Sequence, residues 1–142
     1  MKRWIVRIAV ALAVLFVAIQ LAPAGRTNPP VTKTLEAPPE VLAILRRSCF
    51  DCHSNESRWP WYAYVAPVSW LVVHDVDEGR RELNFSHWGD MPQAKRDSKA
   101  SSMVEEIEGG EMPLEPYLWM HSDAKLSPAD LKVLQSWSEG DV

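Results

Sequence analysis

The sequence predicts an all-α fold, a small helical domain with long loops that follows an apolar N-terminal helix. Apolar residues recur at helical spacing in four separate stretches after residue 39. Proline, serine and glycine stand where several of these stretches begin or end, as they do at helix termini. No stretch alternates between apolar and polar residues as a half-buried strand would. A chain of 142 residues allows one modest domain plus a short extension.

Residues 1–25 have the layout of a signal peptide or membrane anchor. A basic start over residues 2–7 precedes a nearly unbroken apolar run over residues 8–21, and Ala22-Pro23-Ala24 resembles a cleavage site. The apolar run is short for a membrane span, but counting residues 4–22 lengthens it enough for an anchor. Cleaved signal and anchor therefore both stay open. In either case the basic end stays in the cytoplasm and the domain is exported.

Residues 26–39 are interpreted as a proline-rich linker between this segment and the folded domain at 40–142. The linker holds four prolines and has no apolar period, so we expect an extended, semi-rigid tether that holds the domain away from a membrane.

The charge of the chain excludes one class of partner. After Gly25 the chain carries 12 basic and 19 acidic residues, a net charge of −7. A nucleic-acid-binding domain would present a basic face, so we expect no nucleic acid. An acidic surface remains compatible with a basic protein partner.

The first two helices of the domain are expected on either side of an aromatic loop. Pro39 suits a first helical turn, and the apolar residues after it have helical spacing up to Ser48-Cys49. Trp59-Pro60-Trp61-Tyr62 is expected to form the loop. Pro67 then opens a second helix that ends near Gly79.

Two more helices are expected in the second half of the domain. One covers about Met91–Glu108 and is closed by Gly109-Gly110. The last has the clearest start, with Ser127 as N-cap, Pro128 in the first turn and Asp130 three residues after the cap. Its inner stripe is Leu131, Leu134 and Trp137.

Cys49-Phe50-Asp51-Cys52-His53 is the strongest chemical signal in the chain. The pattern C-x-x-C-H is the attachment signature of c-type haem. Two thiols three positions apart can add to the two vinyl groups on one edge of the macrocycle, and the next residue places an imidazole beneath the iron. Phe50 and Asp51 are interpreted as spacers. These are the only two cysteines, so no disulfide framework is available.

Two other interpretations of these residues stay open. A thioredoxin-like dithiol also uses C-x-x-C, but its thiols open a helix after a strand, whereas this motif is expected to close a helix. A zinc site needs four ligands, typically from two separated pairs, and the sequence has no second pair with regular spacing.

The chain resembles the small haem-binding domain family of bacterial c-type cytochromes. The matching pieces, in order, are Cys49–Ser54, Pro60-Trp61-Tyr62, Gly79-Arg80, Leu83–Trp88 and Met112-Pro113. The resemblance covers roughly Asn28 to Trp137. It implies haem binding and, by extension, electron transfer. Together with the C-x-x-C-H motif and the N-terminal export signal, it predicts a cytochrome c-like domain with one covalent haem c in the periplasm.

Met112 is the predicted sixth ligand of the iron. It follows a Gly-Gly break and precedes Pro113, so it lies in a stiffened loop, similar to the distal methionine loop of small cytochromes c. A thioether ligand would raise the reduction potential relative to a second imidazole. His121 and His74 are the best substitutes.

Several other residues are candidates for contact with the cofactor. Trp59, Trp61 and Tyr62 closely follow the motif and are expected to wall the haem. Arg80 is the candidate partner for a haem propionate, with Arg58 and Arg81 as further possibilities.

The predicted function is that of a single-haem electron carrier, not an enzyme, with redox proteins as its unidentified partners. An open distal site would instead indicate a haem-based sensor or a peroxidase-like enzyme. A third class is an accessory subunit that passes electrons to a larger redox complex.

Overall fold

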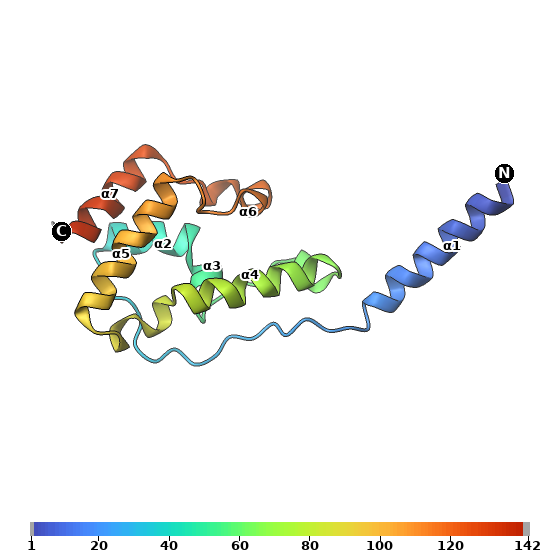
Figure 1. Cartoon of the computed structure of the whole chain (residues 1–142), viewed down its shortest axis with the longest axis horizontal. Coiled ribbons are helices and arrows are strands. Elements are labelled where there is room, and N and C mark those ends of the chain that lie inside the picture. Colours follow the sequence, from blue (N-terminus) through green and yellow to red (C-terminus); the bar gives the residue numbers. More distant parts are fainter. Residues whose placement is uncertain (1, 141–142) are drawn as a thin grey trace.

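The computed structural model describes residues 2–140 and is helical throughout, with no strand among those residues (Figure 1). The prediction of an all-α fold is confirmed. Seven α-helices and three short 3-10 helices follow one another in this order: α1 (Lys2–Ile19), α2 (Pro39–Ser48), α3 (Phe50–His53), η1 (Trp61–Tyr64), α4 (Val68–Glu82), η2 (Phe85–Asp90), α5 (Gln93–Glu108), α6 (Glu115–Met120), η3 (Ser122–Ala124) and α7 (Pro128–Glu139).

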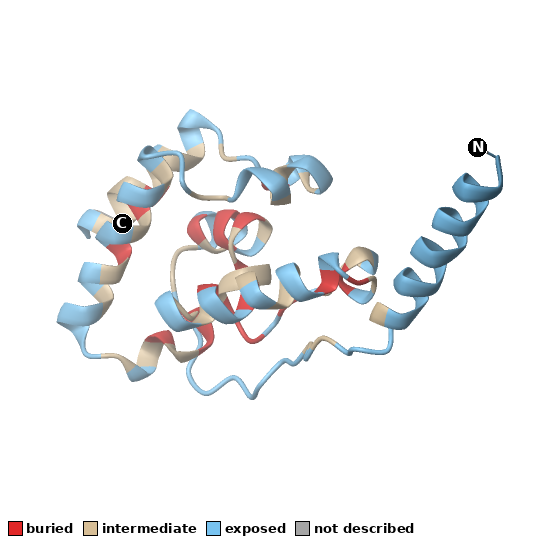
Figure 2. Cartoon of the chain, turned by 45° about the vertical axis from the view of Figure 1, so that its right-hand side comes forward, coloured by how far each residue is buried: buried red, intermediate tan, exposed pale blue. Residues whose placement is uncertain are grey.

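Helix α1 stands apart from the rest of the molecule. It has no buried residue, and in Figure 2 it is exposed along nearly its whole length. Within residues 2–140, no helix combines the length and the apolar character needed to cross a membrane.

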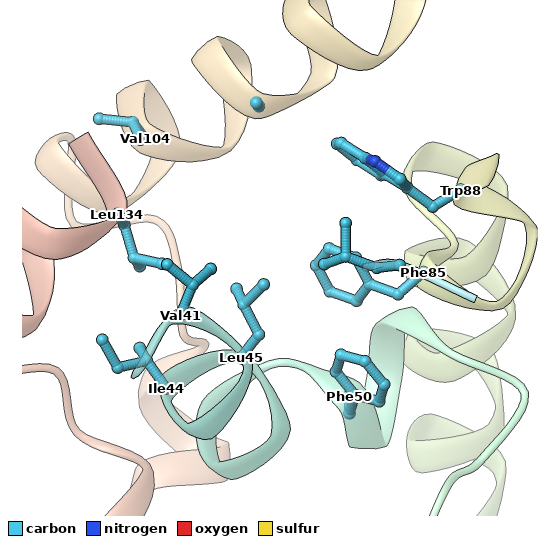
Figure 3. Packing of buried hydrophobic residues seen from close by; sticks show 10 residues of the cluster. Val41, Ile44, Leu45, Phe50, Phe85, Trp88, Val104 and Leu134 are labelled. Carbon is cyan, nitrogen blue, oxygen red and sulfur yellow. The ribbon is translucent and has the colours of Figure 1, made fainter. Parts of the chain in front are cut away.

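The hydrophobic core lies where α2, α5 and α7 meet η2. Val41 and Leu45 of α2 and Leu134 of α7 are completely buried in it. Phe85 of η2 is also fully buried and stacks on Phe50 of α3, with ring centroids 5.0 Å apart. Figure 3 shows these side chains converging from the separate helices. The core thus reaches directly to the short helix that carries the C-x-x-C-H motif.

The helix that was expected to run into the motif is interrupted there. Helix α2 ends at Ser48, and Cys49 has φ −128° and ψ −34°, outside the regular helical region. Helix α3 then carries Phe50–His53. The amide of His53 still bonds the carbonyl of Cys49, at 2.9 Å, so the motif forms one compact turn after the break.

Helix α4 is longer than predicted, because Gly79 lies inside it and does not end it. The helix continues to Glu82, and Gly79 is buried against α3. A Cβ atom on Gly79 would meet the carbonyl oxygen of Cys52 at 2.9 Å. Glycine therefore permits the close approach of two helices at this position, which sequence alone does not distinguish from a helix stop.

The last helix begins as predicted. Ser127 accepts a bond from the Asp130 amide, and the Asp130 carboxylate accepts one from the Ser127 amide, forming a complete capping box. Helix α5 also agrees with its prediction to within two residues at its start and ends at Glu108 as expected.

Parts of the expected long loops are short helices. Residues 61–64, 85–90 and 122–124 form 3-10 turns, and α6 follows the predicted Met112 loop. These pieces are too short for helical periodicity to reveal them.

Residues 26–38 contain no helix but do not form a free tether, because much of this segment is bonded to the domain. The amide of Leu35 bonds the carbonyl of Phe85 at 2.9 Å, and the Leu35 side chain is buried in the core. The side chain of Asn28 donates to the carbonyl of Ser57 at 2.9 Å. The segment therefore belongs structurally to the domain, and we call residues 26–35 the strap.

Candidate haem site

The two cysteines of the motif are unpaired thiols. Neither forms a disulfide, and each is half-buried where α3 meets α4. Burial raises the pKa of Cys49 to about 12, and the neighbouring Cys52 adds to the shift. Burial likewise raises the pKa of Cys52 to about 12, with Asp51 as the next cause. Both groups are therefore neutral thiols in the folded chain near neutral pH.

The His53 imidazole is held in one orientation by backbone carbonyls. Its Nδ1 lies 2.9 Å from the carbonyl oxygen of Gly79 and 3.2 Å from that of Leu83. Because carbonyl oxygens only accept, Nδ1 must carry the proton and donate it. Burial lowers the pKa of His53, which favours the neutral ring. Its Nε2 is therefore left with a free lone pair, as a metal ligand requires.

Phe50 has a structural role that sequence reasoning missed. It is 3% exposed and stacks on Phe85. The Phe85 ring also packs edge-on against His53, with ring centroids 6.4 Å apart. The central carbon of the Arg46 guanidinium lies over the Phe50 ring, 4.7 Å from its centre. This residue therefore anchors the motif in the core. Its size and apolarity are the only sequence signals of that role.

Asp51 was also interpreted as a spacer, and it too makes specific contacts. Its carboxylate accepts bonds from the amide and Nε of Arg58, at 3.1 and 3.3 Å. It also accepts a bond from the Tyr117 hydroxyl of α6 at 3.1 Å. Burial, and then the Asp51 charge, raise the pKa of Tyr117, so its phenol stays protonated. Asp51 thus joins the motif to α6, and no sequence pattern reveals this long-range pair.

Two cavities lie against Cys49 and His53, with volumes of about 360 and 260 Å³. Cys49, His53 and Met112 line both of them, while Cys52 lines the smaller. The structure therefore brings the predicted sixth ligand, which lies far away in sequence, to the cavities that His53 faces.

The walls of these cavities combine apolar side chains with a polar margin. Leu83, Phe85, Met103, Ile107 and Leu126 line the larger cavity, together with Glu82, Lys99 and Glu106. Among the described residues that line either cavity, Lys99 is the only lysine or arginine, and it lies 3.8 Å from Glu82. Lys99 is a site residue that sequence reasoning did not find.

Trp59, Trp61 and Tyr62 line a different cavity from the one that was expected. That cavity, of about 380 Å³, lies between η1, α4 and α6 and meets the motif at Asp51 and Cys52. These aromatic side chains are thus next to the motif, on the side of Cys52, but do not line the cavities that His53 and Met112 share.

Arg80 is bonded to protein acceptors. Its Nε donates to the carbonyl of Ser54 at 2.7 Å, and Nη1 donates to that of Thr27 at 2.8 Å. Nη2 donates to Asn28 Oδ1 and Ser57 Oγ, at 2.8 and 2.9 Å. Arg80 lines neither cavity at His53, and it fastens the strap to the segment after the motif.

None of the other candidate residues lines these cavities, although each contacts a residue that lines the smaller one. His74 is exposed and lies 3.4 Å from Glu78, one helical turn along α4. His121 stacks on Tyr117, with ring centroids 4.1 Å apart. Arg58 pairs with Asp51, and Arg81 lies 3.7 Å from Glu78.

The residues present fit a haem group. Two free thiols, an imidazole with Nε2 unengaged and a thioether surround the same largely apolar space. The Ser48 hydroxyl, which borders both cavities, is buried without a hydrogen-bond partner among the described residues. Across residues 2–140, no three His, Cys, Asp or Glu side chains gather into a metal-binding group.

The fold and the site together define a small helical haem-binding domain. The family model described as "Haem-binding domain" matches residues 14–140, nearly the whole chain. This chain belongs to that family, which confirms the resemblance noted from its motifs. Neither the curated proteins nor the solved structures gave a match.

Proposed function

We propose that this chain is an exported, single-haem c-type electron carrier whose haem iron is held by His53 and Met112. Haem bound in this way supplies one-electron redox chemistry. The observation that supports this proposal most is the fixed His53 ring, whose Nε2 is free, beside cavities that Met112 also lines. If His53 and Met112 both held the iron, no ligand position would be left for a substrate, so the domain would carry electrons and would not be an enzyme.

Covalent attachment would use both thiols of the motif. Each S–H adds across one vinyl double bond, so sulfur bonds to one carbon and the hydrogen goes to the other. No oxidant is consumed. Because burial keeps Cys49 and Cys52 in the neutral form, the folded chain presents them poorly as thiolate nucleophiles, and attachment is expected before the domain closes.

The apolar walls would exclude water from the iron, and Lys99 is suited to balance the charge of a haem propionate. Lys99 takes this role in preference to Arg80, whose guanidinium already bonds four protein acceptors.

Export to the periplasm is supported by the N-terminal pattern. Residues 2–7 are basic, residues 8–21 are almost entirely apolar, and α1 presents this sequence as an exposed helix. We also propose that residues 4–22 associate with a membrane. The donor and acceptor would be redox proteins that meet the domain on the periplasmic side.

The proposal is tested by absorption spectra of the chain exported together with a haem-maturation system. We expect haem that survives denaturation and low-spin bands in both redox states. We also expect a methionine–iron charge-transfer band in the oxidised state, which Met112→Ala abolishes. Met103→Leu is the matched control, because Met103 lines the larger cavity from α5 and should leave the band intact.

Other outcomes would identify a different chemistry. A five-coordinate, high-spin spectrum that shifts with carbon monoxide or peroxide would indicate a sensor or a peroxidase-like enzyme. A low-spin spectrum that lacks the methionine–iron band, and that becomes high-spin in His121→Ala or His74→Ala, would assign the sixth ligand to that histidine. Absence of covalent haem would contradict the proposal.

A further inference from the structure

Large exposed apolar side chains of the domain are concentrated on one face. Outside residues 1–25, the described residues of this kind, apart from Val31 of the strap, lie on or beside η1, the start of α4, and α6. We call them the aromatic face: Trp61, Tyr64, Val68, Trp70, Leu71, Leu114, Trp119 and Met120. Trp61 and Trp119 are 70% and 74% exposed. A concentration of this kind marks an interaction surface.

The aromatic face lies at the end of the domain from which α1 emerges. Figure 1 shows η1 and the start of α4 close to the end of α1, with α6 on the other side of the intervening space. Trp61, Leu71 and Trp119 from these elements line the cavity of about 380 Å³. The exposed apolar surface of α1 and that of the domain therefore occupy the same end of the molecule.

Four hydrogen bonds attach residues 20–26, which directly follow α1, to this face. The side chain of Gln20 accepts from the amide of Ala66 at 2.9 Å and donates to its carbonyl at 3.1 Å. The indole of Trp70 donates to the carbonyl of Ala22 at 3.1 Å. Arg26 donates to the carbonyl of Ala63 at 3.0 Å, and its guanidinium lies 4.2 Å from the centre of the Tyr64 ring. These bonds hold the residues that follow α1 beside the aromatic face.

We propose that the aromatic face is a lipid-contacting surface that rests in the headgroup region of a bilayer when α1 is embedded there. The inference rests on the proposed membrane association of residues 4–22. Tryptophan and tyrosine favour the membrane interface because they join an apolar ring to a polar N–H or O–H group. The eight side chains of the face are uncharged, so neutral lipid suits them, and an apolar helix that leads directly into the face would bring the bilayer to it.

The test uses the full haem-loaded chain in phosphatidylcholine vesicles that contain a phosphatidylcholine with a photoactivatable group near its headgroup. After illumination, mass spectrometry locates the lipid adducts. We expect adducts on α1 and also on the peptides that contain Trp61, Tyr64 and Trp119. The double variant Trp61→Asp/Trp119→Asp should lose adducts on the face by about tenfold while those on α1 persist. Val31→Asp, at an exposed apolar residue of the strap, should change neither.

The positions of the adducts separate the membrane association of α1 from lipid contact at the aromatic face. Adducts on α1 with none on the aromatic face would leave the membrane association standing and overturn the lipid-contacting surface. Absence of adducts from both regions would overturn the association and the surface together. Haem absorption spectra of each variant establish that it is folded.

Discussion

The Tyr117 hydroxyl donates a hydrogen bond to the Asp51 carboxylate across 3.1 Å, joining α6 to the C-x-x-C-H motif. Met112 precedes Tyr117 by five residues, in the loop that leads into α6. One side of this loop is attached to α5, and its other side is held by the Tyr117–Asp51 pair. The bond therefore restrains the position of Met112 relative to His53.

Tyr117→Phe should loosen the Met112 loop. Loss of a half-buried hydrogen bond to a carboxylate is expected to lower the free energy of unfolding by about 1–3 kcal/mol. The charge-transfer band assigned to the Met112–iron bond should weaken or become more sensitive to temperature. The control is Tyr62→Phe, whose hydroxyl makes only a longer contact of 3.4 Å with His121. Equal spectra for the two variants would contradict the positioning role.

Gly79→Ala should destabilise the domain, although alanine is the better helix former. The new Cβ would meet the Cys52 carbonyl oxygen at 2.9 Å and force α4 away from α3. We expect a loss of about 1–3 kcal/mol in denaturant unfolding, against a gain of about 1 kcal/mol at an unhindered helical site. Ser101→Ala, at an exposed position of α5, provides the comparison. A stabilised Gly79→Ala protein would refute the close-packing argument.

Arg80→Lys should release the strap. One ammonium group cannot reproduce bonds from three guanidinium nitrogens to four acceptors. We expect a loss of about 2–3 kcal/mol in stability and faster amide hydrogen exchange across residues 26–35. Arg81→Lys, at an exposed residue with one weak ion pair, serves as control. A changed haem reduction potential, with unchanged hydrogen exchange across the strap, would instead indicate that Arg80 pairs with a haem propionate.

The haem-free chain should lose stability as the pH rises above about 9. The unfolded thiols ionise near their ordinary pKa of 9.0, whereas the folded Cys49 and Cys52 stay protonated until about pH 12. The unfolded state then binds fewer protons, so stability falls between these values, by about 1.4 kcal/mol per thiol for each pH unit. Urea unfolding from pH 7 to 10 measures the effect. In the haem-free variant Cys49→Ala/Cys52→Ala, the free energy of unfolding should depend much less on pH. The same pH dependence in both proteins would contradict the raised pKa values of the two thiols.

Local sequence signals predicted the helices that have clear boundaries. The capping box at Ser127 and Asp130 and the helical spacing in α2 and α5 depend on residues a few positions apart, so a single sequence displays them. Met112 was predicted as the sixth ligand of the iron, and it lines the same two cavities as His53. Its role as a ligand stays a prediction.

The contacts that were missed join residues far apart in the sequence. Asp51 and Tyr117 are separated by 66 positions, and Arg80 reaches Thr27 across 53. Neither pair has a local pattern, because each forms only when the chain folds back on itself. The interpretation of Gly79 as a helix stop was wrong for the same reason, since its neighbour is Cys52 of another helix.

The bonded strap has a consequence for how the domain would meet other proteins. A flexible arm would let a haem carrier sweep a wide volume and visit donor and acceptor in turn. Here residues 26–35 are fastened by Arg80, by Asn28 and by the buried Leu35, so the domain has little freedom to swing about α1. The proposed electron carrier would then keep a nearly constant position relative to α1, and its redox partners would have to diffuse to it.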